Sequence, residues 1–278
     1  MDFSTLFPGI AGWVSSLPKT WPFSMWQDVY APFGALHLVG LALMGGCVIL
    51  LNLRLMGAGL TEEQPSTLER NLRPWLITGF VIVFGTGLII GALNSEKLYY
   101  SPAFFAKMMA LIAAAIFTFG VTNAIAKNEG KVSTPTLITG GIAFLVWLFS
   151  IGVFSTTEGV SPGVFHMVAA GFAIFFIYGG RKLFGISSRL IAAIIFAILY
   201  GGMFVIYWIV GFNNYDQIYL DLSKWSMIVG SVLLLGLYGY EIQAGKAEAS
   251  SPVAKLIALF SVLAWVTVAG GGRWIGFS

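Results

Sequence analysis

Three features of the sequence predict an all-α membrane protein: its composition, its long apolar stretches and an internal repeat. Of its 278 residues, 58% are hydrophobic and only 10% are charged, and the mean hydropathy is +0.86. A soluble domain carries about 25% charged residues, so the composition excludes an ordinary soluble fold. Because no polar segment is long enough to form a separate domain, we expect the polar parts to be loops.

Eight apolar stretches are long enough for a transmembrane helix, which takes about twenty mostly apolar residues. They lie at residues 31–53, 74–93, 103–126, 135–155, 162–180, 189–211, 224–243 and 253–274. Before them, residues 3–27 are rich in Phe and Trp, but several prolines interrupt this segment. We therefore expect residues 1–30 to lie at the membrane interface rather than to cross it.

The chain also repeats itself near its middle. His37-Leu-Val-Gly and the later Asn-Leu-Arg54-Leu-Met-Gly57 parallel His166-Met-Val-Ala and Gly-Arg181-Lys-Leu-Phe-Gly185. Further landmarks recur at a nearly constant offset: Arg73 with Arg189, Gly85 with Gly201, Lys107 with Lys224, and Trp147 with Trp265. The units would be residues 31–155 and 156–278, with four helices each. Since four is even, both units share one topology, and we expect a pseudo-twofold axis along the membrane normal.

The positive charges predict the orientation in the membrane. Alternate connections hold ten of the Lys and Arg residues, and the other side, with both termini, holds five. By the positive-inside rule, the richer side is cytoplasmic. We therefore expect a multi-pass protein of the bacterial inner membrane with both termini in the periplasm, and the Met-Asp start gives no sign of a cleavable signal peptide.

The two histidines of the chain, His37 and His166, are the candidate metal ligands. They occupy equivalent positions in the repeat, in the outer parts of the first and fifth predicted helices. Two imidazoles at one depth on facing helices suit bis-histidine ligation of one non-covalent haem b. Gly34 and Gly163, each one turn before its histidine, would let a porphyrin approach the backbone. The alternative is that each histidine simply hydrogen-bonds to a neighbouring helix.

Three cations at the same outer level are candidates for holding the haem propionates. Lys107 and Lys224 begin the third and seventh predicted helices, and Arg273 lies near the outer end of the eighth. An ionisable group at membrane depth indicates function by default. The alternative for these long side chains is that they extend to the interface and meet water.

Several short motifs resemble a known group of bacterial membrane proteins. Leu36-His-Leu-Val-Gly-Leu-Ala-Leu-Met-Gly-Gly, Thr86-Gly87, Ser101-Pro-Ala-Phe-Phe-Ala-Lys107 and Gly272-Arg-Trp-Ile-Gly276 are similar to the copper-resistance D family. That resemblance implies copper import, and methionine with imidazole suits Cu(I). The first-helix histidine pattern also resembles that of membrane b-type cytochromes, which implies haem ligation by His37.

Nothing in the sequence resembles a phosphate loop, a catalytic triad or a zinc-protease motif, so hydrolytic chemistry has no support. From the candidate haem site we expect a one-electron carrier or a redox or haem sensor rather than a catalyst. Its partners would be the lipid bilayer, a quinol or periplasmic redox protein, and other membrane subunits or a second copy. The modest net charge of +3 does not indicate nucleic acid. Two alternatives stay open, namely a copper or small-solute transporter and a cofactor-free structural subunit of a membrane complex.

Overall fold

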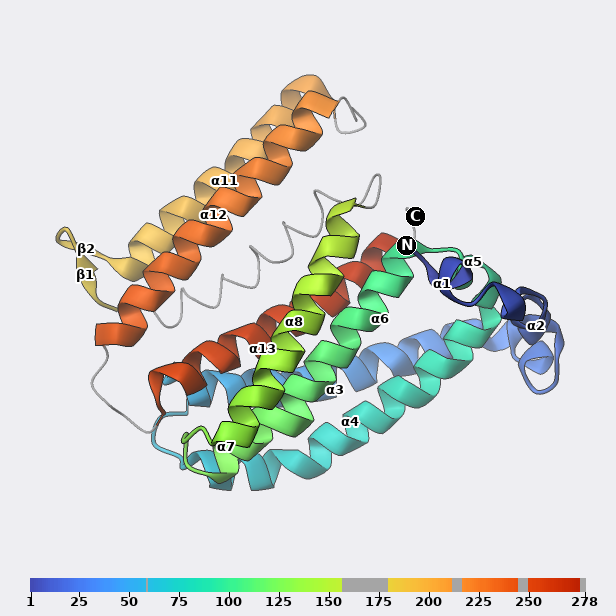
Figure 1. The fold of residues 1–278 in the computed structure, drawn as a ribbon, viewed down its shortest axis with the longest axis horizontal. Helices are drawn as coiled ribbons and strands as arrows, with labels where there is room; N and C mark the ends of the chain where they lie inside the picture. The colour runs from blue at the N-terminus through green and yellow to red at the C-terminus, as the bar shows by residue number, and fades with distance from the viewer. Residues whose placement is uncertain (59, 157–179, 212–216, 245–249, 276–278) are drawn as a thin grey trace.

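A computed structural model describes residues 1–58, 60–156, 180–211, 217–244 and 250–275, and the described chain is almost entirely helical (Figure 1). Its long helices are α3 (Tyr30–Met56), α4 (Pro65–Leu93), α6 (Pro102–Ala115), α8 (Thr134–Thr156), α11 (Ser188–Val210), α12 (Gln217–Ala244) and α13 (Pro252–Trp274). Helix α6 continues through a π-helical segment, η5 (Ile116–Thr122), into α7 (Asn123–Lys127). Residues 102–127 therefore form one continuous rod.

Six helical segments among the described residues are long and apolar enough to cross a membrane. They are Tyr30–Met56, Pro65–Leu93, Pro102–Lys127, Thr134–Ser155, Ser188–Val210 and Pro252–Gly272. Each coincides with a predicted stretch, so the chain is a multi-pass helical membrane protein. Helix α12 covers a seventh stretch, but its apolar part, Ile228–Ile242, is shorter. Residues 157–179, with most of the predicted stretch at 162–180, lie outside the described residues.

Helix α4 begins more than two turns before the predicted start of its span at residue 74. Pro65 lies in its first turn, where the missing N–H costs no intrahelical hydrogen bond. Glu69 and Arg73 then form an i,i+4 ion pair within the helix, and Pro74 lies inside it. The predicted start was wrong because these polar residues and prolines look like a loop when only hydropathy is considered.

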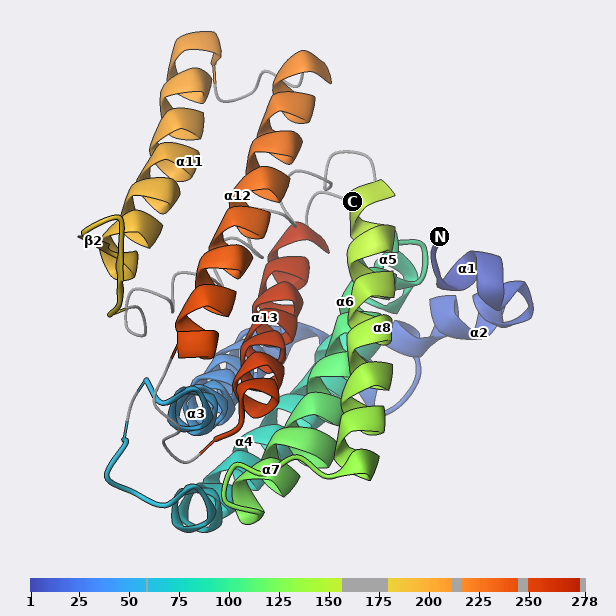
Figure 2. The ribbon, with the colours of Figure 1, turned by 60° about the vertical axis from the view of Figure 1, so that its left-hand side comes forward.

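Helices α3 and α4 form a closely packed antiparallel pair, and α13 packs against α3 and α6 in the centre of the bundle (Figures 1 and 2). Of the apolar stretch of α13, 67% is buried inside the molecule. Gly79 allows the close approach of α3 to α4, because a Cβ atom there would lie 2.7 Å from the backbone nitrogen of Met44. A Cβ atom at Gly40 would likewise lie 2.7 Å from Ile82.

Helices α11 and α12 form a hairpin whose upper end in Figure 1 stands away from the bundle, as Figure 2 also shows. Nearer the other end, Tyr238 of α12 is fully buried and donates a hydrogen bond to the Lys255 carbonyl of α13 at 2.8 Å. Only 13% of the apolar stretch of α11 is buried, so most of its side chains are available to lipid. A short ribbon of β1 (Lys182–Leu183) and β2 (Ile186–Ser187) precedes α11, and its turn places Phe184 and Gly185 at positive φ.

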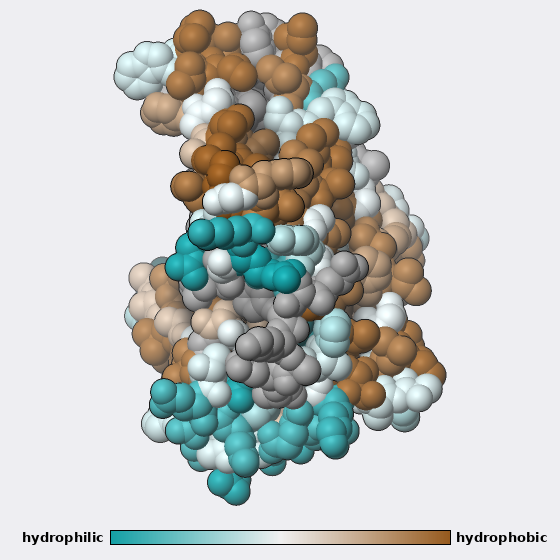
Figure 3. All heavy atoms as spheres, turned by 90° about the vertical axis from the view of Figure 1, so that its left-hand side faces the viewer, coloured by the Kyte–Doolittle hydropathy of each residue, from teal (hydrophilic) through white to brown (hydrophobic). Residues whose placement is uncertain are grey.

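The two ends of the bundle differ in character. Basic residues of the predicted cytoplasmic loops lie at the end of the bundle where α3, α7 and α12 finish. Figure 3 shows this end, with hydrophilic residues across its middle and bottom and the apolar hairpin above them. At the other end, short helices of the N-terminal segment, α1 (Phe3–Leu6) and α2 (Ala11–Ser16), lie beside α5 (Ser95–Tyr99) (Figure 1). Ser95 donates a hydrogen bond to the Val14 carbonyl at 2.7 Å. Trp13 and Trp21 of this segment are exposed.

Candidate functional site

The imidazole of His37 lies on the outer half of α3 and is held by α4. Its Nδ1 atom is 2.8 Å from the hydroxyl oxygen of Thr86. The Thr86 hydroxyl donates its own hydrogen to the carbonyl of Ile82 at 2.6 Å, so its oxygen must accept from the imidazole. Nδ1 therefore carries the proton, and Nε2 keeps an unprotonated lone pair.

Two further groups on the same turn of α4 support this arrangement. The Val83 carbonyl, which can only accept, is 3.3 Å from the Thr86 oxygen and faces the imidazole. A Cβ atom at Gly87 would lie 3.3 Å from Cε1 of His37, so a larger residue there would press on the ring. Thr86 and Gly87 together fix the ring orientation and leave Nε2 of His37 without a hydrogen-bond partner among the described residues.

Gly34 lies one turn before His37, on the same side of α3. A Cβ atom added at Gly34 would have no atom of another residue within 4 Å. The space beside this turn is therefore open.

Lys107 lies near the start of α6 and is the predicted site cation whose side chain the structure describes. Its side chain packs against the end of α13, where a Cβ atom at Gly272 would lie 3.5 Å from Nζ. No carboxylate of the described residues forms a salt bridge with it. Lys107 is thus a half-buried ammonium with capacity for an anionic partner.

The other predicted site residues are placed only in part. Arg273 follows Gly272 in α13, so its backbone lies next to Lys107, but its side chain is outside the description. Lys224 belongs to α12, in the hairpin that both ribbon views show apart from α6, and its side chain is also undescribed. His166 and Gly163 lie outside the described residues altogether.

Within the described part of the chain, no three His, Cys, Asp or Glu side chains are grouped to hold a metal ion. A haem needs less from the protein, because the porphyrin supplies four ligands and two axial positions remain. His37 can supply one of these through Nε2. The described residues thus contain one half of the predicted site.

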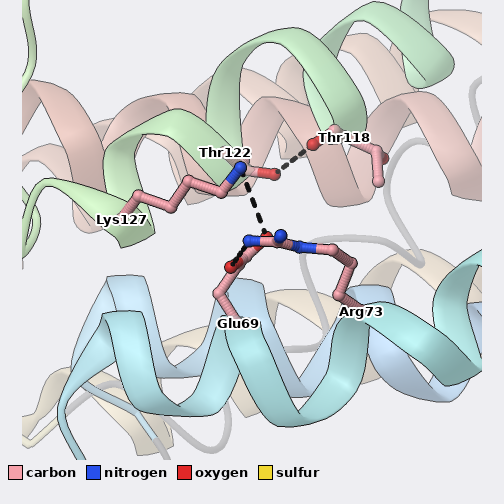
Figure 4. A network of polar contacts seen from close by, with 5 residues as sticks. All are labelled: Glu69, Arg73, Thr118, Thr122 and Lys127. Carbon is pink, nitrogen blue, oxygen red and sulfur yellow. Dashed lines mark hydrogen bonds and ion pairs between the residues drawn. The ribbon is translucent and has the colours of Figure 1, made fainter.

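A second polar cluster lies at the opposite end of α4 (Figure 4). Glu69 is 2% exposed, and both of its carboxylate oxygens accept from Arg73, with Nε at 2.8 Å. Lys127 from α7 lies 3.9 Å from the same carboxylate. Sequence reasoning counted Arg73 and Lys127 among the basic residues that set the orientation, used Arg73 as a repeat landmark, and missed Glu69, although the Glu-x-x-x-Arg spacing was visible.

Glu241 is a further buried carboxylate among the described residues. It lies on α12, is 6% exposed, and accepts from the backbone N–H groups of Gly180 at 3.2 Å and Arg181 at 2.8 Å. The hydroxyl of Ser188 at the start of α11 donates to the same oxygen, Oε1. Glu241 therefore joins the end of α12 to the start of α11.

Comparison with known proteins gives one family. The model of DUF6644, a family of unknown function, matches residues 19–161, which include His37, Thr86 and Lys107. No curated protein and no solved structure matches the chain. The family match does not bear out the resemblance to copper-resistance D proteins or to b-type cytochromes.

Proposed function

The chain belongs to the DUF6644 family of unknown function, and we propose that it holds one haem b between His37 and His166 in the bacterial inner membrane. The observation that carries the proposal is the hydrogen bond from Nδ1 of His37 to Thr86. Histidines that ligate metals almost always donate their other ring N–H to a fixed acceptor, which sets the tautomer and the ring orientation. His37 has this arrangement, with Nε2 left for the iron.

The surroundings of His37 fit a haem in two further respects. The open space at Gly34 allows a flat macrocycle to approach α3. The ammonium of Lys107, which pairs with no carboxylate of the described residues, suits the propionate carboxylates, and Arg273 follows next to it along α13. His166, with Gly163 one turn before it, would provide the second axial ligand, and Lys224 would add a further cation from the second half.

Eight spans in two four-helix units belong to this proposal, with the pseudo-twofold axis along the membrane normal and both termini in the periplasm. Glu69 and Glu241 support it. Each is a buried carboxylate that ties the start of the unit's second helix to the end of its third, in α4 and α7 or in α11 and α12. In such a protein, helices 1 and 5 would face each other and bring the two histidines to one depth.

When bound, haem would supply one-electron chemistry near the periplasmic face. One centre close to one face is a poor conductor across a hydrocarbon core about 30 Å thick. We therefore propose electron exchange with a quinol or a periplasmic redox protein, or redox or haem sensing, rather than conduction across the membrane. The protein's residues bind the group, orient it and exclude water from it.

The test is an absorption spectrum of the purified protein, oxidised and reduced, with haem supplied during expression. We expect a Soret band, sharp reduced α and β bands, and one haem per chain. His37→Ala and His166→Ala should each abolish the low-spin spectrum, while the exposed control Lys97→Ala should keep it. A full spectrum in both histidine variants would overturn the ligand assignment.

A colourless protein would overturn the haem proposal and separate the alternatives. If it binds Cu(I), the copper transporter becomes the better interpretation, and the thioether and imidazole side chains are the ligands to test. If it binds neither haem nor copper, a small-solute transporter or a structural subunit of a membrane complex remains.

A further inference from the structure

An amide oxygen without a partner lies inside the bundle, between α3 and α13. Asn52 is 1% exposed, and the facing Ser261 is fully buried. Nδ2 of Asn52 donates to the carbonyl of Val48 at 2.8 Å and lies 3.4 Å from the Ser261 hydroxyl oxygen. Oδ1 of Asn52 has no hydrogen-bond partner among the described residues.

This orientation of the amide is fixed by its neighbour. The Val48 carbonyl can only accept, so it requires the nitrogen of Asn52 on its side and leaves the oxygen on the other. Turning the amide over would place two acceptors together and leave the NH₂ group unpaired. An unsatisfied carbonyl in an apolar interior costs about 1–3 kcal/mol, and buried groups of this kind normally have a partner.

The described residues do not offer that partner. Around Asn52, α3 presents apolar buried residues such as Leu51, Leu55 and Met56. The donor one turn beyond Ser261 on α13 is the indole of Trp265, and it already donates to Thr118 at 2.9 Å. The hydroxyl hydrogen of Ser261 has no acceptor among the described residues.

We propose that Asn52 and Ser261 bind an internal water molecule within the membrane-embedded bundle. The water would donate to Oδ1 of Asn52 and accept from the hydroxyl of Ser261, which meets the two to four polar contacts that buried waters make. A hard divalent cation takes six or more oxygen ligands, and this place offers two neutral ones. The inference does not depend on haem, so it stands or falls separately from the proposed function.

Hydroxyl-radical footprinting with X-rays tests the site directly, since bound water is itself a radical source. Met56 lies one turn from Asn52 and is 0% exposed, whereas Met44 lies two turns away on the other side and is 1% exposed. We expect oxidation of Met56 in the native protein, its loss in Asn52→Leu and Ser261→Ala, and little oxidation of Met44 throughout. No oxidation of Met56 above the level of Met44 in the native protein would overturn the proposal.

Thermal stability in detergent is an independent test of the water site. If Oδ1 is unpartnered, Asn52→Leu removes a penalty and raises Tm; if water satisfies it, the variant loses those hydrogen bonds and Tm falls by roughly 2–4 °C. The double variant Asn52→Leu with Ser261→Ala should recover part of the fall, because both polar groups are then gone. A rise in Tm of Asn52→Leu contradicts the water site even if the variant folds well.

Discussion

The two ends of α4 carry polar contacts of opposite kinds. At the basic end, both oxygens of Glu69 are used, by Arg73 in the same helix and by Lys127 from α7. At the other end, Thr86 uses only one nitrogen of His37, and the ammonium of Lys107 has no carboxylate partner among the described residues. A closed cluster joins helices, whereas an open one keeps binding capacity for something else. Mutations at the two ends should therefore affect different properties.

The largest effect on stability is expected at Glu241, which forms a second closed cluster between α12 and the start of α11. Glu241→Ala would leave two backbone N–H groups and the Ser188 hydroxyl without their acceptor, at a cost of about 3 kcal/mol. All three donors share the single oxygen Oε1, which glutamine also has, so Glu241→Gln should cost less than about 1 kcal/mol. Unfolding in mixed micelles measures both, and equal losses would show that the charge, not the acceptor, matters.

At the open end, Thr86→Val should weaken haem retention without unfolding the protein. Valine has a similar shape but cannot accept from Nδ1 of His37, so the ring loses its fixed tautomer. Loss of such an outer partner typically costs 10–100-fold in affinity. Competition for haem by apomyoglobin measures this effect, and Thr86→Ser should restore most of the affinity. Unchanged retention in Thr86→Val would mean that the hydrogen bond serves only helix packing.

Glu69→Gln is the matching change at the closed end, with an expected loss of about 1 kcal/mol in stability. The amide keeps one acceptor oxygen but loses the two-oxygen contact with Arg73 and the attraction to Lys127. Because Arg73 and Lys127 are 42% and 54% exposed, water can solvate them when the carboxylate is gone. The haem spectrum should not change, and a spectral change here would break the distinction between the two ends.

The smallest effect concerns Lys107. Removing a half-buried ammonium without a carboxylate partner should slightly stabilise the protein without haem, while haem retention falls by a few-fold through the lost propionate contact. Lys107→Gln tests both, with Tm of the haem-free protein and haem transfer as readouts. If Lys107 instead stabilises the fold, Lys107→Gln should lower the Tm of the haem-free protein.

Much of the fold could be predicted because hydropathy alone carries the signal for apolar helices such as α3, α8 and α13. The start of α4 could not be predicted in the same way, since Glu69 and Arg73 are polar residues, and Glu69 becomes buried only through its pairing with Arg73 in three dimensions. The role of Thr86 was equally hidden. Its contact with His37 spans the whole α3–α4 hairpin and depends on how the two helices align, which neither residue reveals by itself.

The close approach of α3 and α4 at Gly79 has a consequence for the distant imidazole. Met44 lies seven positions after His37, and Gly79 lies seven positions before Thr86, about two turns in each helix. In an antiparallel pair these equal intervals bring His37 opposite Thr86 whenever Met44 rests on Gly79. Gly79, which has no side chain at all, thus sets the axial register of the α3–α4 pair. It thereby also sets the direction in which Nε2 of His37 points. Even the single methyl group of Gly79→Ala would be felt two turns away, at the histidine.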